Sequence, residues 1–415
     1  MVTVRPFKGL RPKKEYAAQV ASPPYDVVNS EEAEKLAAGN DLSFLHVVKP
    51  EIDLEPGIDP YDDKVYAEAV ENFKRLINDE ILVQDDAENL YFYKLTFEGR
   101  SQLGLVCCCS ADDYDAGTIL KHELTREDKE LDRSRHVSAL DANAGPVFFL
   151  YRARERLDEL AAEATAGPPE YDFVSYDGVR NEFWVVEDKE LIDAIVAEFA
   201  GMRNVYVADG HHRTASGAVV RTWRRDANPG HTGDEEYNFF LTVLFPHDKL
   251  NIMDYNRVVQ DLNDLSSDEF VEAIEGKFEV LPHDGEVPYK PEALHHFGMY
   301  LDGKWYRVIA KPRTFDEDDP VGSLDSAILQ NNLIAPILGI EDLRTDKRID
   351  FVGGVRGLEE LEKRCDEEGY AVAFAVHPMS VEQLMAVADA GKILPPKSTW
   401  FEPKLKSGLI VHMLS

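Results

Sequence analysis

Residues 205–220 read VYVADGHHRTASGAVV, and this stretch decides the interpretation of the fold. Its apolar start predicts a short strand, Asp209-Gly210 predicts a tight turn, and the residues from His211 onward predict a helix. A strand that passes through a turn directly into a helix is typical of chains in which the two kinds of element alternate. We therefore expect an α/β protein.

Two hairpins are predicted away from this stretch. The apolar segments 90–97 and 102–110 flank a Glu-Gly-Arg turn, and segment 295–311 turns at Asp302-Gly303. Further strands are expected at 147–153, 183–188 and 205–209, and helices at 189–200, 211–225, 268–277, 324–338, 357–368 and 380–391. The fold class that follows is mixed α/β (α+β), with mixed sheets and hairpins inserted among βα units, and not a regular doubly wound sheet.

Two helices are expected in the first eighty residues. Ser30 caps a short helix that ends at Gly39, and Asp59-Pro60 opens a longer one. The longer helix places four apolar residues on one face: Val65, Ala69, Phe73 and Leu76.

The length of 415 residues allows two or three domains, or one large domain with insertions. The acidic, Pro- and Gly-containing linkers 229–236 and 312–322 do not clearly split the chain. We treat residues 1–415 as one unit and expect it to comprise a phosphate-binding core (1–230) and an accessory α/β region that closes the site (231–415).

The charge balance argues against two classes of partner. With 78 acidic and 45 basic residues, the net charge of −33 repels a nucleic-acid backbone and an anionic membrane. The N-terminus lacks a signal region and no run of 18 apolar residues occurs, so we expect a cytoplasmic protein. The run Cys107-Cys108-Cys109 is interpreted as small buried strand residues in a reducing compartment. The oligomeric state is left open.

The turn at 209–213 has the residue types of a phosphate site. The first N–H groups of a helix lack partners and carry the positive end of its dipole, and Gly210 allows close backbone approach. Arg213 can grip phosphate oxygens with two hydrogen bonds, while His211 and His212 can donate to phosphate or shuttle a proton. The alternative is an Asp-Gly turn whose histidines only cap the helix.

The same stretch resembles the phosphate-holding turn of the ParB/sulfiredoxin fold. A longer resemblance spans nearly the whole chain, to the bacterial and archaeal family called domain of unknown function 1015. It is carried by SPPYDVV (22–28), FLHVVKPEIDL (44–54), KHELTREDKELDRSRH (121–136), VADGHHRTAS (207–216) and LPPKSTWFEPKLKSGL (394–409). What the resemblance implies is handling of nucleotide phosphates, since relatives in this broad fold include CTP-hydrolysing partition proteins, ATP-using sulfiredoxins and kinases of free serine.

The chain departs from two of these relatives. Residues 209–213 lack the reactive cysteine of a sulfiredoxin, and neither a helix-turn-helix nor a basic DNA surface is visible. The resemblance therefore favours a cytoplasmic kinase that moves a phosphoryl group from ATP or ADP, with Mg²⁺, onto a small hydroxylated metabolite such as serine. The alternative is a ParB-type regulatory switch that binds CTP or ATP without turning over a metabolite.

A second group of charges follows at 121–136. If Thr125 caps a helix, its spacing places four residues on one stripe: Arg126, Lys129, Arg133 and His136. Adjacent cations in an acidic protein repel one another unless an anion compensates them, which indicates a second set of phosphate contacts. A solvated helix with local salt bridges is the alternative.

The predicted catalytic residues are Glu123, His122 and Asp209. By analogy with the serine kinases, Glu123 is the expected base and His122 the second choice, although Glu123 is equally consistent with an ion pair to Lys121 or Arg126. Asp209 or Asp26 is expected to hold the metal, with a structural Pro-Pro corner as the alternative role for the segment of Asp26.

A basic, hydroxyl-containing loop lies near the C-terminus. It starts at Lys397 and Ser398 and ends in two aromatic residues. We expect it to contact the nucleotide, by phosphate contact or by stacking on the base. A surface loop with core aromatics is the alternative.

Overall fold

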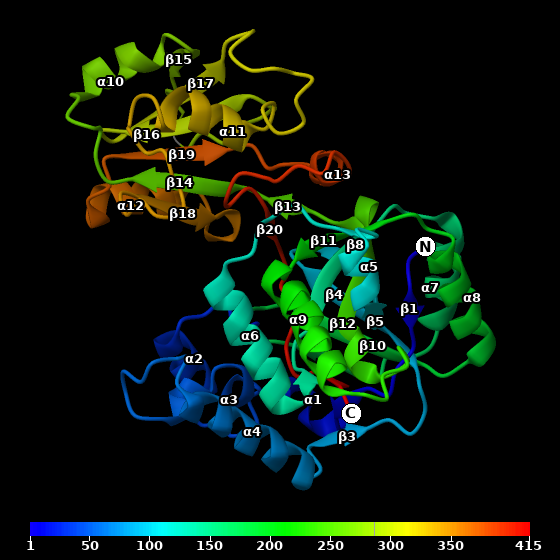
Figure 1. Cartoon of the computed structure of the whole chain (residues 1–415). Helices are drawn as coiled ribbons and strands as arrows, with labels where there is room; N and C mark the ends of the chain where they lie inside the picture. Colours follow the sequence, from blue (N-terminus) through cyan, green and yellow to red (C-terminus); the bar gives the residue numbers. More distant parts are fainter. Residues whose placement is uncertain (286) are drawn as a thin grey trace. The chain divides into compact units, whose positions relative to one another are not determined.

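The computed structural model describes residues 1–285 and 287–415. The chain forms two compact units, 1–250 with 403–415 and 251–402 (Figure 1). The boundary falls after Leu250 and not at the expected position 230, and the last residues return to the first unit. In the described part of the chain, none of the helices combines the length and the apolar composition that crossing a membrane requires.

The first unit is built on a nine-stranded sheet in the order β6-β11-β8-β12-β5-β4-β10-β9, with β1 beside β5. β11 runs parallel to β6 and β12 parallel to β8, whereas the other pairs are antiparallel, so the sheet is mixed as expected. Its strands are β1 (Val4–Arg5), β4 (Leu90–Phe97), β5 (Arg100–Ser110), β6 (Ile119–Leu120), β8 (Val147–Tyr151), β9 (Tyr171–Val174), β10 (Arg180–Val186), β11 (Val205–Asp209) and β12 (Phe239–Pro246). The predicted hairpin at 90–110 is β4-β5.

Helices cover this sheet. A second, smaller core of this unit is formed around Phe44, Phe73 and Val411. α7 and α8 contribute leucine, isoleucine and phenylalanine side chains to the core that contains Cys107 and Cys109. All three consecutive cysteines are buried free thiols on β5, as interpreted from the sequence. The helices of this unit are α1 (Ala17–Val20), α2 (Ser30–Ala37), α3 (Leu45–Val48), α4 (Asp63–Asn78), α5 (Ala111–Asp115), α6 (Glu127–Leu140), α7 (Glu155–Ala164), α8 (Lys189–Ala200) and α9 (His211–Ala227).

Two helix starts differ from the prediction. The cap of α2 is Asn29 and not Ser30, because Asn29 and Glu32 bond each other's backbone N–H in a capping box. α4 starts at Asp63 behind the cap Asp62, since the residues from Asp59 first make a turn. The predicted apolar face of α4 is buried.

Two short strand pairs connect the ends of the chain to the smaller core. They join β2 (Leu10–Pro12) to β3 (Leu82–Gln84) and β7 (Ala142–Asn143) to β21 (His412–Met413). The C-terminal strand thereby ends next to the loop that leads into β8, and this brings residues 403–415 close to the predicted phosphate turn.

The second unit is an antiparallel sheet in the order β15-β17-β16-β19-β14-β18. The predicted hairpin at 295–311 is β16-β17. The elements are β13 (Ile252–Met253), β14 (Tyr255–Val259), α10 (Ser267–Ile274), β15 (Phe278–Pro282), β16 (His296–Leu301), β17 (Lys304–Ala310), α11 (Asp325–Leu329), β18 (Ile349–Gly353), α12 (Glu359–Glu368), β19 (Val372–Val376), α13 (Val381–Asp389) and β20 (Trp400–Phe401). Apolar residues of both α10 and α11 pack into its core.

Candidate functional site

The turn between β11 and α9 has the predicted geometry. Gly210 occupies the N-cap position with φ +87° and ψ 33°, a left-handed conformation that strains any residue with a Cβ. An added Cβ would also lie 3.3 Å from the guanidinium carbon of Arg213, which folds back over the turn. No described side chain caps this helix, so the first N–H groups of α9 remain available to an anion.

Asp209 is held in its charged form at the end of β11. One carboxylate oxygen accepts the N–H of Gly210 at 3.0 Å, and the other accepts Nζ of Lys404 at 3.0 Å. Burial alone would raise the pKa of this carboxyl, but Lys404 and Arg213 hold it well below its usual range. Asp209 therefore anchors the turn to the C-terminal segment.

Arg213 is a largely buried cation with incomplete partners. Nη1 donates to the carbonyl of Pro146, and Nη2 lies 3.6 Å from a carboxylate oxygen of Asp26, too far for a strong hydrogen bond. Nε is buried and has no hydrogen-bond partner among the described residues. Burial lowers the pKa of Arg213, but Asp26 and Asp209 outweigh this effect and raise it.

A cavity of about 520 Å³ including its open mouth lies beside Arg213. Arg133 lines it as well, stacked 4.0 Å above the ring of Tyr25 and bonded through Nε to Asp132 at 2.8 Å. The remaining wall is Val48, His136, Val137, Asn143, Ala144, Gly145, Val147, Phe240, Leu241 and Ser407. α6 and α9 pack against each other (Figure 1). The side chains of Arg133 on α6 and Arg213 on α9 thus line one cavity.

The residues of the predicted cationic stripe on α6 have different surroundings. Arg133 and His136 line the cavity, but Arg126 is exposed and paired with Asp128, and Lys129 donates to the hydroxyl of Tyr61 at 2.7 Å. Two of the four residues of the predicted stripe therefore line this cavity, and phosphate contacts of Arg126 and Lys129 stay a prediction.

His136 also differs from the expected cation. Burial lowers its pKa to about 4, and its Nε2 lies 2.8 Å from the carbonyl oxygen of Val47, so it lines the cavity as a neutral ring.

The N-terminal end of α6 is displaced from the prediction as well. The helix starts at Glu127 with Arg126 in the cap position, and the hydroxyl of Thr125 donates to Glu130. The backbone N–H of Arg126 donates to Nε2 of His212 at 3.1 Å, which connects the start of α6 to the turn. Burial lowers the pKa of His212, so this ring accepts a hydrogen bond in its neutral form.

A pair of buried histidines stands behind the turn. The rings of His122 and His211 meet edge to face, with centroids 4.4 Å apart. Both ring nitrogens of His122 and Nε2 of His211 lack a described partner. Burial lowers the pKa of His211 to about 4 and that of His122 well below its usual value, so both rings are neutral at neutral pH.

Glu123 connects this pair to the surface. Its carboxylate oxygen lies 3.6 Å from Nδ1 of His211, and about half of its side chain (49%) is exposed. The structure thus places Glu123 and His122 beside His211, which lies in the helix start that follows Asp209. The catalytic roles of Glu123, His122 and Asp209 stay predictions.

A family model described as a protein of unknown function, DUF1015, matches residues 4–327. This chain belongs to the DUF1015 family. The comparison with curated proteins found no match.

Several solved structures are similar to this DUF1015 chain at low scores. A conserved hypothetical protein from Pyrococcus furiosus has 12% identity over 73% of this chain and 93% of its own, with a TM-score of 0.34. A free serine kinase in complex with AMP has 13% identity over 74% and 91%, with a TM-score of 0.37. SbnI with a C-terminal truncation, from Staphylococcus aureus, has 12% identity over 72% and 82%, also at 0.37. At these scores the site must be interpreted from its own geometry, and the likeness of its turn to the ParB/sulfiredoxin turn stays a prediction.

The DUF1015 chain completes its site with residues that the sequence interpretation missed. Lys404 reaches Asp209, Ser407 and Asn143 line the cavity, and the carbonyl of Pro146 holds Arg213. The sequence signal for this segment was the pair of lysines at 404 and 406 in an otherwise acidic protein. Lys404 lies 195 residues along the chain from Asp209, the carboxylate that it binds.

The two predicted metal ligands differ in how firmly they are held. Within residues 1–285 and 287–415, no group of three or more His, Cys, Asp or Glu side chains is arranged to hold a metal ion. Asp209 is engaged on both oxygens, whereas Asp26 is 37% exposed and makes a looser contact with Arg213. Mg²⁺ in phosphate sites needs only one or two carboxylates besides the phosphates, and Asp26 fits that requirement better.

Lys397 and Ser398 lie in the second unit and not in the unit of the turn. Nζ of Lys397 is 5.6 Å from the ring centroid of Tyr255, and the hydroxyl of Ser398 donates to the carbonyl of Pro395 at 2.7 Å. Their predicted contact with a nucleotide at Gly210 stays a prediction.

Proposed function

We propose that the first unit binds the phosphate groups of ATP or ADP at the Gly210 turn and transfers a phosphoryl group to the hydroxyl of a small metabolite. The observation that carries this proposal is Arg213. It is a buried guanidinium with an unpartnered Nε and a carboxylate no nearer than 3.6 Å, beside an uncapped helix start. A buried cation of this kind gains most from an anion that reaches several of its donors at once.

The donors of the site match a chain of phosphates. N–H groups of the first turn of α9 hold one phosphate, and the guanidinium groups of Arg213 and Arg133 reach it and its neighbour from the cavity. Binding requires Arg213 to exchange Asp26 for phosphate oxygens, which the long 3.6 Å contact allows at small cost. Lys404 keeps Asp209 paired, so this carboxylate does not repel the ligand as a bare charge.

Glu123 is the proposed base. The hydroxyl oxygen of the metabolite forms a bond to the terminal phosphorus, the bond from that phosphorus to the bridging oxygen breaks, and the hydroxyl proton passes to the Glu123 carboxylate. The nucleotide leaves with one phosphate fewer. His211 is neutral and contacts Glu123 through Nδ1, so it can orient the carboxylate without neutralising it.

Mg²⁺, when bound with the nucleotide, would neutralise charge on the transferred group, and Asp26 is the proposed protein ligand. The accessory role of residues 231–415 in closing the site stays a proposal. CTP is an alternative nucleotide.

The test is product formation with a panel of donors and acceptors. Purified full-length protein is incubated with Mg²⁺, with ATP, ADP or CTP, and with small hydroxylated metabolites that include serine, and phosphorylated products are identified by mass spectrometry. We expect a phosphorylated metabolite from the wild type and little from Arg213→Ala. The control is Arg156→Ala, which removes an arginine exposed on α7. Nucleotide binding without product for any acceptor would contradict the kinase and favour a nucleotide-dependent switch.

A further inference from the structure

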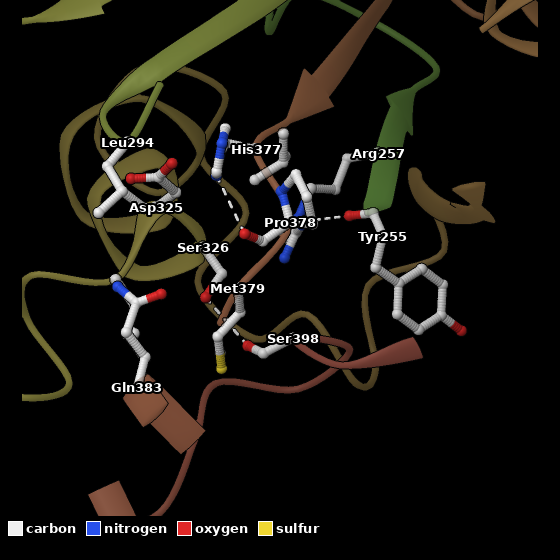
Figure 2. A pocket seen from close by; sticks show the side chains of 12 residues that line it. Tyr255, Arg257, Leu294, Asp325, Ser326, His377, Pro378, Met379, Gln383 and Ser398 are labelled. Carbon is white, nitrogen blue, oxygen red and sulfur yellow. Dashed lines mark hydrogen bonds between the residues drawn. The ribbon is translucent and has the colours of Figure 1, made fainter. Parts of the chain in front are cut away.

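The second unit contains a pocket of its own, separate from the site proposed above. Including its open mouth, it has an empty volume of about 330 Å³, and it is formed by β14, the segment after β19, and the starts of α11 and α13 (Figure 2). Polar side chains that line it include Arg257, Asp325, Ser326, Gln383 and Ser398. The hydroxyls of Ser326 and Ser398 lie 3.0 Å apart.

Arg257 is the most deeply buried charge of this pocket. It is 1% exposed, and its guanidinium donates only to backbone carbonyls, those of Tyr255 and, at 3.3 Å, Lys397. It forms no ion pair with a described carboxylate, and its Nε has no described partner. Burial lowers the pKa of Arg257 to about 10, so the side chain is still a cation at neutral pH. A buried cation without a counter-charge is costly.

Asp325 presents a carboxyl group on another wall of the same pocket. Burial raises its pKa to about 7, so a bound ammonium group would favour its charged form. Asp325 is 5% exposed, and one oxygen accepts the backbone N–H of His295 at 2.9 Å and lies 3.0 Å from its ring Nδ1. The other oxygen is buried and has no described partner. Asp325 and Arg257 do not pair with each other, although both line the pocket (Figure 2).

We propose that this pocket binds a small zwitterion, a molecule with one carboxylate and one amino group. The ligand's carboxylate would pair with Arg257, and its amino group would pair with the Asp325 oxygen that has no described hydrogen-bond partner. Ser326, Ser398 and Gln383 would offer neutral hydrogen bonds. A simple anion satisfies Arg257 and leaves Asp325 unpaired, and a simple amine does the reverse. Only a ligand with both charges completes both residues, and the small volume restricts it to a few heavy atoms beyond them.

The pocket is tested by matching the probes to the two charges. Full-length protein is titrated with glycine, β-alanine, L-alanine and L-serine, and with acetate and methylamine as half-ligands, using saturation-transfer NMR and calorimetry without nucleotide. We expect at least one amino acid to bind at least tenfold more tightly than either half-ligand. Asp325→Asn should remove this preference over acetate, whereas Asp350→Asn, at a half-exposed carboxylate, should keep it.

Two results would overturn the proposal. One is that no amino acid of the panel binds, and the other is that acetate binds as tightly as the amino acids. Arg257→Lys should weaken the amino acids about tenfold. If that variant fails to fold, the Asp325→Asn comparison still decides. Arg213→Ala should leave amino-acid binding unchanged, so the proposal on the second unit is tested independently of the kinase.

Discussion

Arg213 in the first unit and Arg257 in the second are both buried arginines that line a cavity, and they differ in their surroundings. Asp26 and Asp209 near Arg213 raise its pKa, whereas the hydrogen bonds of Arg257 go only to backbone carbonyls and burial lowers its pKa to about 10. The first cation must exchange a partner to bind a ligand. The second forms no ion pair with a described carboxylate that it would have to exchange.

This difference separates two ways of building an anion site. A ligand at Arg213 competes with Asp26, so it must bring several charges, as a nucleotide does. A ligand at Arg257 compensates a buried charge that has no ion-paired carboxylate, so one carboxylate group is enough for this residue, while Asp325 needs the ligand's amino group. The predictions below compare a change in one unit with the behaviour of the other.

The largest expected effect is on turnover in the first unit. Glu123→Gln keeps the shape of the side chain but removes the base, so phosphoryl transfer should slow by about a hundredfold or more. Nucleotide affinity should change little, because the cationic cavity is lined by other residues, Arg213 and Arg133 among them. Rapid-quench measurement of product is the test, with Glu159→Gln on α7 as the control. Full turnover in Glu123→Gln would remove Glu123 as the base and leave the phosphate site standing.

The next effect is an opposite pH dependence of stability in the two units. Burial lowers the pKa of His136 and His211 to about 4, so below pH 6.5 the unfolded state binds protons that the folded state does not. The first unit should lose about 1.4 kcal/mol per pH unit for each of them between pH 6.5 and 4. Asp325 has a raised pKa of about 7, so protonation favours its folded form, and it should add stability to the second unit as the pH falls from 7 toward 4. The lowered pKa of His295 opposes that gain in part.

Hydrogen exchange resolved by peptide, corrected for its intrinsic pH dependence, measures the two units separately. His136→Gln should reduce the loss in the first unit, and Asp325→Asn should reduce the gain in the second. Parallel slopes in both units, unchanged by either substitution, would contradict this account of the buried groups.

The smallest effect concerns two glycines. Gly210→Ala and Gly369→Ala both force a side chain into left-handed backbone, at φ +87° and +85°, and each should cost roughly 1–2 kcal/mol of stability. The space around Gly369 is open, whereas a Cβ at Gly210 meets Arg213 at 3.3 Å. Only Gly210→Ala should therefore also weaken nucleotide binding. Equal nucleotide affinity in both variants would show that the turn does not position Arg213.

Local signals in the sequence predicted most of the elements. The hairpin at 90–110 and the turn at Gly210 each follow from a glycine between apolar segments, and both are present. The cap of α2 was missed by one residue, although Glu32 three positions after Asn29 was a signal for the capping box. The return of residues 403–415 to the first unit could not be predicted, because it depends on pairing between segments far apart in the chain.

The difference between local signals and long-range pairing also decides which site residues could be predicted. Arg213 was found because its helix, glycine and acid are adjacent in sequence. Lys404 and the pocket of Arg257 were not, because their partners come from segments that only folding brings together. That Arg126 and Lys129 do not line the cavity with Arg133 has another cause. Helical spacing predicts which residues share a face but not which of them find a local partner first, and these two bind Asp128 and Tyr61.

The central claim is that Arg213 grips nucleotide phosphate, and calorimetric titration of ATP with Mg²⁺ into three proteins tests it most directly. Relative to the wild type, Arg213→Ala should weaken binding by roughly 1.5–3 kcal/mol, about tenfold or more. Arg213→Lys keeps the charge but loses the two-pronged contact, so its affinity should fall between the other two. Affinity in Arg213→Ala equal to that of the wild type would contradict the phosphate site and the kinase built on it.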